Sequence, residues 1–186
     1  MVIHLPFSVA QKSILKKVPL DFLRNFSKEV WIKGSALVAF QNMRMTAKKD
    51  GVELLVLSAW RSFEEQEWLF QDAEKRHGAG KGILWVAPPG YSEHHTGYII
   101  DVADGTRPET DDEPLFETTK AYEWLKQNAD KFGFKLSFIK NNWQNISYEP
   151  WHWRYVGDEE SKSLFYPPFY RVWLNILKGC FWTWYN

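Results

Sequence analysis

The sequence predicts an α+β fold, in which a small antiparallel sheet is flanked by helices. The stretch 35–49 carries apolar residues at helical spacing, and the stretch 62–76 opens with the pattern of a helix cap. Three others, 52–58, 98–102 and 151–156, are short and rich in β-branched or aromatic residues, as strands are. The length of 186 residues suits one compact domain with a core of its own and some peripheral additions.

The first half of the chain contains two predicted helices with a strand between them. The stretch 34–50 begins with glycine and serine, places its apolar residues mostly on one side and ends at aspartate. Residues 52–58 form a nearly continuous apolar run, which is typical of a buried strand. A serine and a glutamate at the start of 62–76 match a capping box, so we expect a helix there. The glycines and prolines of 78–90 then predict a loop.

The second half supplies the remaining strands and one more helix. Residues 98–102 read as a strand, and the polar stretch 104–113 follows it as a surface loop near the candidate site. Helical spacing returns at 118–130, and 133–138 alternates as a strand does. Residues 151–156 also alternate, which places three aromatic side chains on one face and a histidine and an arginine on the other.

We divide the chain into three parts. Residues 1–34 are expected to be an N-terminal extension, 35–157 the folded domain, and 158–186 an aromatic segment packed on that domain. Polar residues interrupt the apolar run 165–186 too often for a clear membrane-spanning helix. Contact of this segment with a membrane interface, or a dimer surface, is the less favoured alternative.

The composition narrows the classes of function. Lys and Arg together number 23, as do Asp and Glu, so the net charge gives no attraction to nucleic acid. The 11 Trp, 8 Tyr and 13 Phe indicate a dense core, a carbohydrate-facing groove or an interface. Because Cys180 is the only cysteine, neither an intramolecular disulfide nor a cluster of thiolate ligands can form. No secretory signal peptide is visible at the N-terminus.

Two short segments contain the residue types of a catalytic zinc site. His94 and Asp101 would lie roughly 23 Å apart in an extended chain, so the chain must reverse for both to reach one ion. Gly97 offers the turn, because glycine accepts a positive φ. The second segment, 149–152, supplies another carboxylate and another imidazole, and its proline disfavours the helix on which many zinc peptidases place their ligands.

The predicted ligands are His94, Asp101 and His152. Two neutral imidazoles and one carboxylate leave a positive charge on Zn²⁺, which lowers the pKa of bound water. Glu149 would remain uncoordinated and act as the general base. Either histidine alone reads more simply as a hydrogen-bonded residue in an aromatic strand, but four such groups in two short segments favour the metal site.

The sequence also gives expectations for two arginines and for the three remaining histidines. Arg61 follows a predicted strand and could stabilise an oxyanion or a substrate carboxylate, or form a surface ion pair. His95 should support the site or lie at the surface, and Arg154 should pair with an acid that supports the site. His4 and His77 are expected at the surface.

The motifs resemble those of the VanY-type D-alanyl-D-alanine carboxypeptidases and related L,D-carboxypeptidases. The matching stretches are 58–62 (SAWRS) with Gln66, 92–97 (SEHHTG) with Asp101, and 149–157 (EPWHWRYVG). They occur in the same order and with domain-like spacing, which makes the resemblance more specific than a lone motif.

The resemblance implies that 35–157 is a zinc peptidase domain that removes the C-terminal D-amino acid from peptidoglycan stem peptides. It implies zinc ligation by His94, Asp101 and His152, with the metal at one edge of the sheet, and catalysis by Glu149 and Arg61. It further implies action in the cell envelope, periplasmic or extracellular. We expect a monomer whose partner is peptidoglycan.

Substrate choice stays open on the sequence. The resemblance assigns Gln66 and Ser92 to the terminal D-residue of the substrate. The chain departs from the family at 137–139, where Arg-Tyr-Pro is common, and at Ile99, where a small residue is usual. L,D-carboxypeptidase or endopeptidase action on the same site is therefore one alternative. A binding module for wall fragments and a structural domain without metal are the others.

Overall fold

A four-stranded antiparallel sheet forms the centre of the computed structural model, which describes residues 2–166. The strand order is β3–β4–β6–β5. The strands span Leu54–Ser58 (β3), Ile99–Asp104 (β4), Phe134–Leu136 (β5) and His152–Tyr155 (β6). All three neighbouring pairs are antiparallel. The predicted α+β fold with a small antiparallel sheet is therefore confirmed.

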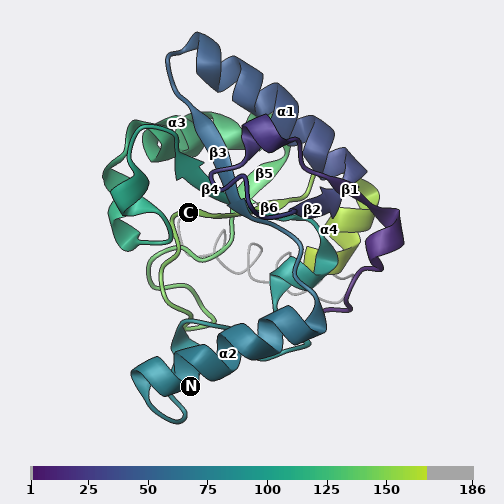
Figure 1. Cartoon of the computed structure of the whole chain (residues 1–186), viewed down its shortest axis with the longest axis vertical. Coiled ribbons are helices and arrows are strands. Elements are labelled where there is room, and N and C mark those ends of the chain that lie inside the picture. Colours follow the sequence, from purple (N-terminus) through teal and green to yellow (C-terminus); the bar gives the residue numbers. More distant parts are fainter. Residues whose placement is uncertain (1, 167–186) are drawn as a thin grey trace, which may run out of the picture.

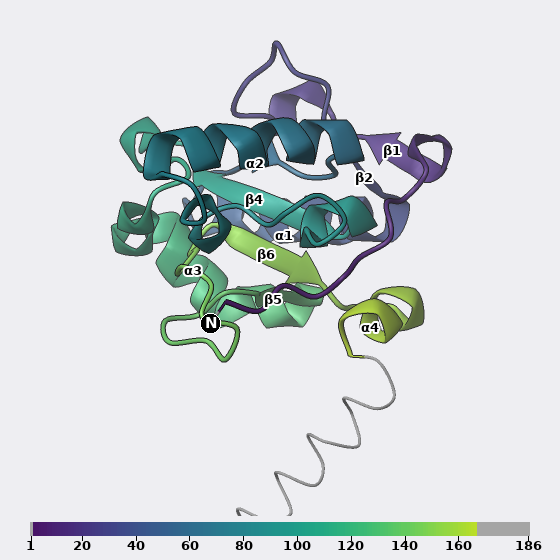
Figure 2. The same ribbon diagram turned by 90° about the horizontal axis from the view of Figure 1, so that it is seen from below.

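In the described part of the chain, four α-helices surround this sheet, and α1 and α2 lie on opposite sides of it (Figures 1 and 2). The helices span Gly34–Lys49 (α1), Phe63–His77 (α2), Lys120–Asn128 (α3) and Glu159–Phe165 (α4). Short 3-10 helices occupy Lys12–Ile14 (η1), Leu20–Phe22 (η2), Gly82–Leu84 (η3), Glu93–Thr96 (η4), Pro108–Thr110 (η5), Pro114–Thr118 (η6) and Ala129–Phe132 (η7). Within residues 2–166, none of the helices has the length and apolarity that crossing a bilayer requires.

The core determines which way the site residues face. Ile100 of β4 and Trp153 of β6 belong to the apolar core, together with Phe40 and Met43 of α1. Because successive side chains on a strand point to opposite faces, the neighbouring residues Asp101 and His152 face away from this part of the core. They point to the side of the sheet on which α2 lies.

The local signals for the ends of α1 and α2 act as expected. The Ser62 hydroxyl accepts a hydrogen bond from the Glu65 backbone N–H at 3.1 Å and so caps α2. The other end of α2 stops at Gly78. Helix α1 ends at Asp50, and Gly51 follows it with a φ of 74°.

The N-terminal region, which we expected to be an extension, contains paired strands. It forms a second, two-stranded sheet, in which β1 (Leu15–Lys17) pairs with β2 (Trp31–Lys33). Before it, residues 3–10 run along the domain, and we call them the N-terminal strap (Figure 2). Backbone N–H groups of the strap donate to loop carbonyls: Ile3 to Gln144 (2.9 Å), Phe7 to Gly90 (2.8 Å) and Ala10 to His95 (2.8 Å).

The C-terminal segment is described only in part. Helix α4 was not predicted, and it begins with a reciprocal capping box between Asp158 and Ser161. Its Phe165 is buried and packs on Phe7 of the strap, with ring centroids 5.7 Å apart. The aromatic segment that we expect to pack on the domain falls mostly on residues 167–186, which lie outside the described residues.

Candidate active site

A tight reversal of the chain brings His94 and Asp101 together. His94 lies on η4, and Gly97 ends that helix with a φ of 75°, a conformation that favours glycine. The chain then enters β4, which carries Asp101. As a result, His94 Nε2 lies 3.3 Å from Asp101 Oδ2.

His152 joins this pair from the neighbouring strand. It stands directly opposite Asp101 in the β4–β6 ladder, so the two side chains share one face of the sheet. His152 Nδ1 lies 3.3 Å from Asp101 Oδ1. The site thus lies on the two central strands, at the end where Asp101 and His152 pair.

Hydrogen bonds on the far side of each imidazole fix which nitrogen faces the aspartate. His94 donates from Nδ1 to the Ala59 carbonyl at 2.5 Å, and His152 donates from Nε2 to Glu93 Oε2 at 3.0 Å. In the neutral imidazoles, the lone pairs of His94 Nε2 and His152 Nδ1 then face Asp101 and can bind a metal ion. Imidazoles that bind metals are commonly oriented in this way.

These three side chains fit a zinc ion. All three are buried, and one ligand atom from each lies within 4.8 Å of the others. Asp101 Oδ1 is buried without a hydrogen-bond partner, which is costly unless another group satisfies it. Two imidazole nitrogens and one carboxylate oxygen are a ligand set that catalytic zinc sites use.

Glu93 holds His152 in place, a role that no local sequence pattern indicated. Its carboxylate accepts hydrogen bonds from His152, from Ser137 Oγ at 2.6 Å and from Arg154 Nη1 at 3.1 Å. Burial favours the protonated form, but Arg154 and His152 outweigh it and lower the pKa of Glu93 to about 2. Arg154 thus pairs with an acid that supports the site, as expected from the sequence. The available signal was the position of Glu93 directly before His94.

Glu149 lies beside His152, with Oε2 at 3.3 Å from Nδ1. Its side chain is only 13% exposed. Burial raises the pKa of Glu149 to about 7, in the range where a carboxyl group can both accept and return a proton near neutral pH. This is the position expected of a base next to a metal site.

Arg61 reaches the same aspartate from the other side. Its Nη2 donates to Asp101 Oδ2 at 2.9 Å and its Nε donates to Ser58 Oγ at 3.2 Å, so its partner is a buried acid and not a surface glutamate. His95 fixes the backbone here by donating from Nδ1 to the Arg61 carbonyl at 2.9 Å. His95 is fully buried, so the alternative that it lies at the surface is wrong.

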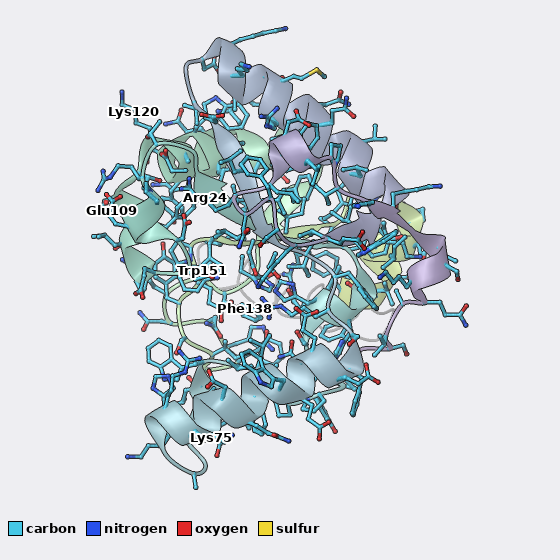
Figure 3. All side chains as sticks on the ribbon, in the orientation of Figure 1. Arg24, Lys75, Glu109, Lys120, Phe138 and Trp151 are labelled. Atoms are coloured by element: carbon cyan, nitrogen blue, oxygen red, sulfur yellow. The ribbon has the colours of Figure 1, made fainter. Side chains whose placement is uncertain are left out.

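A cleft of about 530 Å³ opens over these residues, between the sheet and α2. Figure 3 shows two of its lining side chains, Phe138 and Trp151, in this space. Gln66 and Ser92, the expected substrate contacts, are both buried and also line the cleft. Gln66 Nε2 donates to the Ala87 carbonyl at 2.8 Å, so Gln66 also holds the neighbouring loop.

Three further parts of the chain line the cleft: the loop 104–113, the N-terminal strap and the loop after α2. The predicted loop 104–113 lines it with Asp112 and Glu113, near the site as expected. The strap lines it with His4, Leu5 and Phe7, which no local pattern indicated. His4 is half-buried, so its expected surface position is wrong.

The final contribution comes from the loop after α2. Trp85 lines the cleft, and the exposed His77 lies against it.

Comparisons with known proteins agree with the geometry. The family model described as VanY, D-alanyl-D-alanine carboxypeptidase, matches residues 29–158. A D-alanyl-D-alanine carboxypeptidase of Enterococcus faecalis is 32% identical over 139 residues, which cover 68% of this chain and 48% of the relative. YodJ of Bacillus subtilis is 34% identical over 154 residues, which cover 81% of this chain and 55% of that protein. The chain thus spans about half the length of these two relatives.

Two solved structures are also similar to this chain. The LdcB LD-carboxypeptidase superposes with a TM-score of 0.69 and 33% identity, covering 82% of this chain and 72% of that one. The chain is also similar to a vancomycin-resistance D,D-pentapeptidase VanY solved with Zn(II), with a TM-score of 0.59 and 25% identity over 86% of this chain and 92% of the other. With its family match over residues 29–158, the chain belongs to the VanY family of D-alanyl-D-alanine carboxypeptidases.

Proposed function

We propose that the protein is a zinc-dependent carboxypeptidase that removes the C-terminal D-amino acid from peptidoglycan stem peptides of the D-Ala-D-Ala type. One observation carries this proposal. His94, Asp101 and His152 converge within 4.8 Å, and the Glu149 carboxylate lies 3.3 Å from one of them. Family membership adds the class of substrate.

The proposed chemistry divides between the metal and the protein. Zinc held by His94, Asp101 and His152 supplies Lewis acidity, which polarises a carbonyl group and acidifies water. Glu149 accepts the proton of the attacking water and returns it to the departing amine, so that the peptide bond breaks into a carboxylate and an amine.

Arg61 and two polar residues of the cleft complete the proposed site. The Arg61 guanidinium has five N–H groups, and its bonds to Ser58 and Asp101 leave others for the substrate. We assign it to the charge that develops on the scissile carbonyl oxygen. Gln66 and Ser92 are assigned to the terminal D-residue, because both line the cleft that contains the three proposed ligands.

A second candidate function is L,D-carboxypeptidase action on the same site. The similarity to the LdcB LD-carboxypeptidase, at 33% identity and a TM-score of 0.69, supports it. The two activities differ in which peptide bond is cut. A D,D-enzyme separates two D-residues, whereas an L,D-enzyme cuts between an L- and a D-residue.

Mass spectrometry of the products tests both candidates. The protein is incubated with synthetic stem pentapeptides and tetrapeptides, with and without a zinc chelator. We expect the loss of one D-alanine from the pentapeptide, which the chelator abolishes and added zinc restores. Loss of D-alanine from the tetrapeptide alone would assign the L,D-activity, and intact peptides with zinc-loaded protein would refute both.

The site of action is part of the same proposal. Peptidoglycan lies in the cell envelope, so we place the protein there. Fractionation of cells followed by detection of the protein would test this placement, and recovery in the cytoplasm alone would contradict it.

A further inference from the structure

The end of the cleft near the loop after α2 is lined by aromatic rings. Trp85 is 49% exposed and Tyr91 is 44% exposed, and both line the cleft. The imidazole of His77, at the end of α2, stacks on Trp85 with ring centroids 5.3 Å apart and planes 18° apart. We call Trp85 and His77 the aromatic platform. Single exposed apolar side chains are common, but stacked rings within a catalytic cleft are not explained by chance exposure.

The backbone around Trp85 is held on three sides although its side chain is exposed. Carbonyl groups flanking Trp85 accept hydrogen bonds from three separate parts of the fold: Ile83 from His4 Nε2 of the strap (2.9 Å), Leu84 from the Ser147 backbone (3.2 Å) and Ala87 from Gln66 Nε2 of α2 (2.8 Å). Because the backbone that carries the ring is fixed in this way, ligand binding does not have to order the loop. The platform is therefore preorganised for binding.

Gly82 explains how the loop comes so close to α2. A Cβ atom at this position would lie 2.7 Å from the Glu74 backbone nitrogen, closer than real Cβ contacts occur. Only glycine lets η3 lie directly against the helix, and this contact places Trp85 next to His77. The position of the platform thus depends on the close contact between Gly82 and α2.

We propose that the aromatic platform binds a saccharide ring of the glycan to which stem peptides are attached. One face of a pyranose ring presents C–H groups that pack on an aromatic ring, while its hydroxyl groups bond to polar neighbours. Arg76 and Gln144 line the same cleft and can supply such bonds. Alanyl side chains of a stem peptide are single methyl groups, too small to cover an indole.

This inference rests on the proposed function for its choice of glycan, because the platform is continuous with the proposed catalytic cleft. The cleft would then hold the peptide at His94, Asp101 and His152, and the sugar at the loop after α2. The substrate class is accordingly a muropeptide, in which sugar and peptide are joined, and not a free peptide alone.

Binding of a peptide-free sugar tests the platform independently of hydrolysis. The disaccharide of N-acetylglucosamine and N-acetylmuramic acid is titrated into wild-type protein, Trp85→Ala and Trp68→Ala by calorimetry. Trp68 is a matched control, because it is 64% exposed on α2 and does not line the cleft. We expect Trp85→Ala to weaken binding about tenfold, equivalent to about 1.4 kcal/mol, and Trp68→Ala to leave it unchanged. Trp85→Phe should retain most of the affinity.

Several results would overturn the proposal. Absence of binding to the wild type, or equal loss in Trp85→Ala and Trp68→Ala, would do so. A kinetic comparison adds a second criterion: Trp85→Ala should lower kcat/KM for a sugar-bearing stem peptide and not for the same peptide without sugar. Equal loss on both substrates would show that Trp85 contacts peptide and refute the saccharide site. If neither substrate is cleaved, the proposed function fails, and the disaccharide titration alone decides the platform.

Discussion

Two carboxylates within the site have pKa values shifted in opposite directions because their surroundings differ. Glu149 lies next to His152 and is 13% exposed, and burial raises the pKa of its carboxyl group to about 7 although His152 and Arg61 oppose this shift. Glu93 lies 3.0 Å from the other ring nitrogen of His152, and Arg154, at 3.1 Å, helps to keep it ionised. One group is thus suited to proton transfer and the other to holding an imidazole.

Glu149→Gln should abolish turnover without removing the metal. The amide has the same size but cannot accept a proton, so we expect kcat to fall by about 10²- to 10⁴-fold. The D-alanine release assay measures kcat, and elemental analysis measures zinc per chain. Glu113→Gln, which changes another carboxylate lining the cleft, serves as the matched control. Turnover of Glu149→Gln within a few-fold of wild type would refute the assignment of the base.

Glu93→Gln should weaken zinc binding. The substitution keeps the shape of the side chain but removes the charge that Arg154 balances and that orients His152. Loss of such a supporting carboxylate commonly lowers metal affinity by about 10- to 100-fold. Competition with a fluorescent chelator gives the affinity, and Glu29→Gln, at a surface pair with Lys17, is the control. Equal affinities in the two variants would show that Glu93 does not support the ligand.

Among the elements, the turn between η4 and β4 requires glycine at position 97 for two reasons. A Cβ atom on Gly97 would lie 2.9 Å from Leu15 Cδ2 and 3.3 Å from Lys33 Cγ. The turn is therefore packed against β1 and β2, in addition to having a positive φ. Because it joins two proposed ligands, its stability and the geometry of the site are linked.

Gly97→Ala should cost more stability than Gly51→Ala. The two glycines have nearly the same φ, 75° and 74°, but a Cβ on Gly51 would meet nothing within 4 Å. Both variants strain the backbone, and only Gly97→Ala adds overpacking, worth about 1–3 kcal/mol. Urea unfolding of both variants measures the difference. Equal losses of unfolding free energy would show that Leu15 and Lys33 yield without cost.

Local signals explain which elements the sequence could predict. The cap at Ser62 and the β-branched run before Asp101 are contained in a few residues, so α2 and β4 were predicted close to their observed bounds. The pairing of β1 with β2 was not, because each strand has three residues and its partner is distant in sequence. The role of Glu93 depends on Arg154, 61 residues later, which no local pattern contains.

At the scale of the whole molecule, the strap connects loops that are far apart in the sequence. Its residues bond to the loops around Gly90 and Gln144, and Gln144 Nε2 donates back to the Ile3 carbonyl at 2.9 Å. The family match begins only at residue 29, so the strap lies outside it. One wall of the cleft is therefore built by a part of the chain beyond the family match.

Deletion of residues 1–8 should loosen this wall and leave the sheet intact. Without the strap, the loop 139–147 loses bonds at Gln144, so its amide hydrogens should exchange faster, while those of β4 keep their protection. Hydrogen exchange with mass spectrometry resolves the two regions. Unchanged exchange in 139–147 would show that the strap does not restrain the loop.

The course of the strap has a practical consequence for handling the protein. Ile3 pairs with Gln144 and His4 lines the cleft, so the chain enters the fold beside the cleft. A purification tag joined ahead of the strap would lie next to the cleft, and a histidine-rich tag would carry imidazoles that compete for zinc. Enzymology on this protein therefore calls for a tag that can be cleaved off.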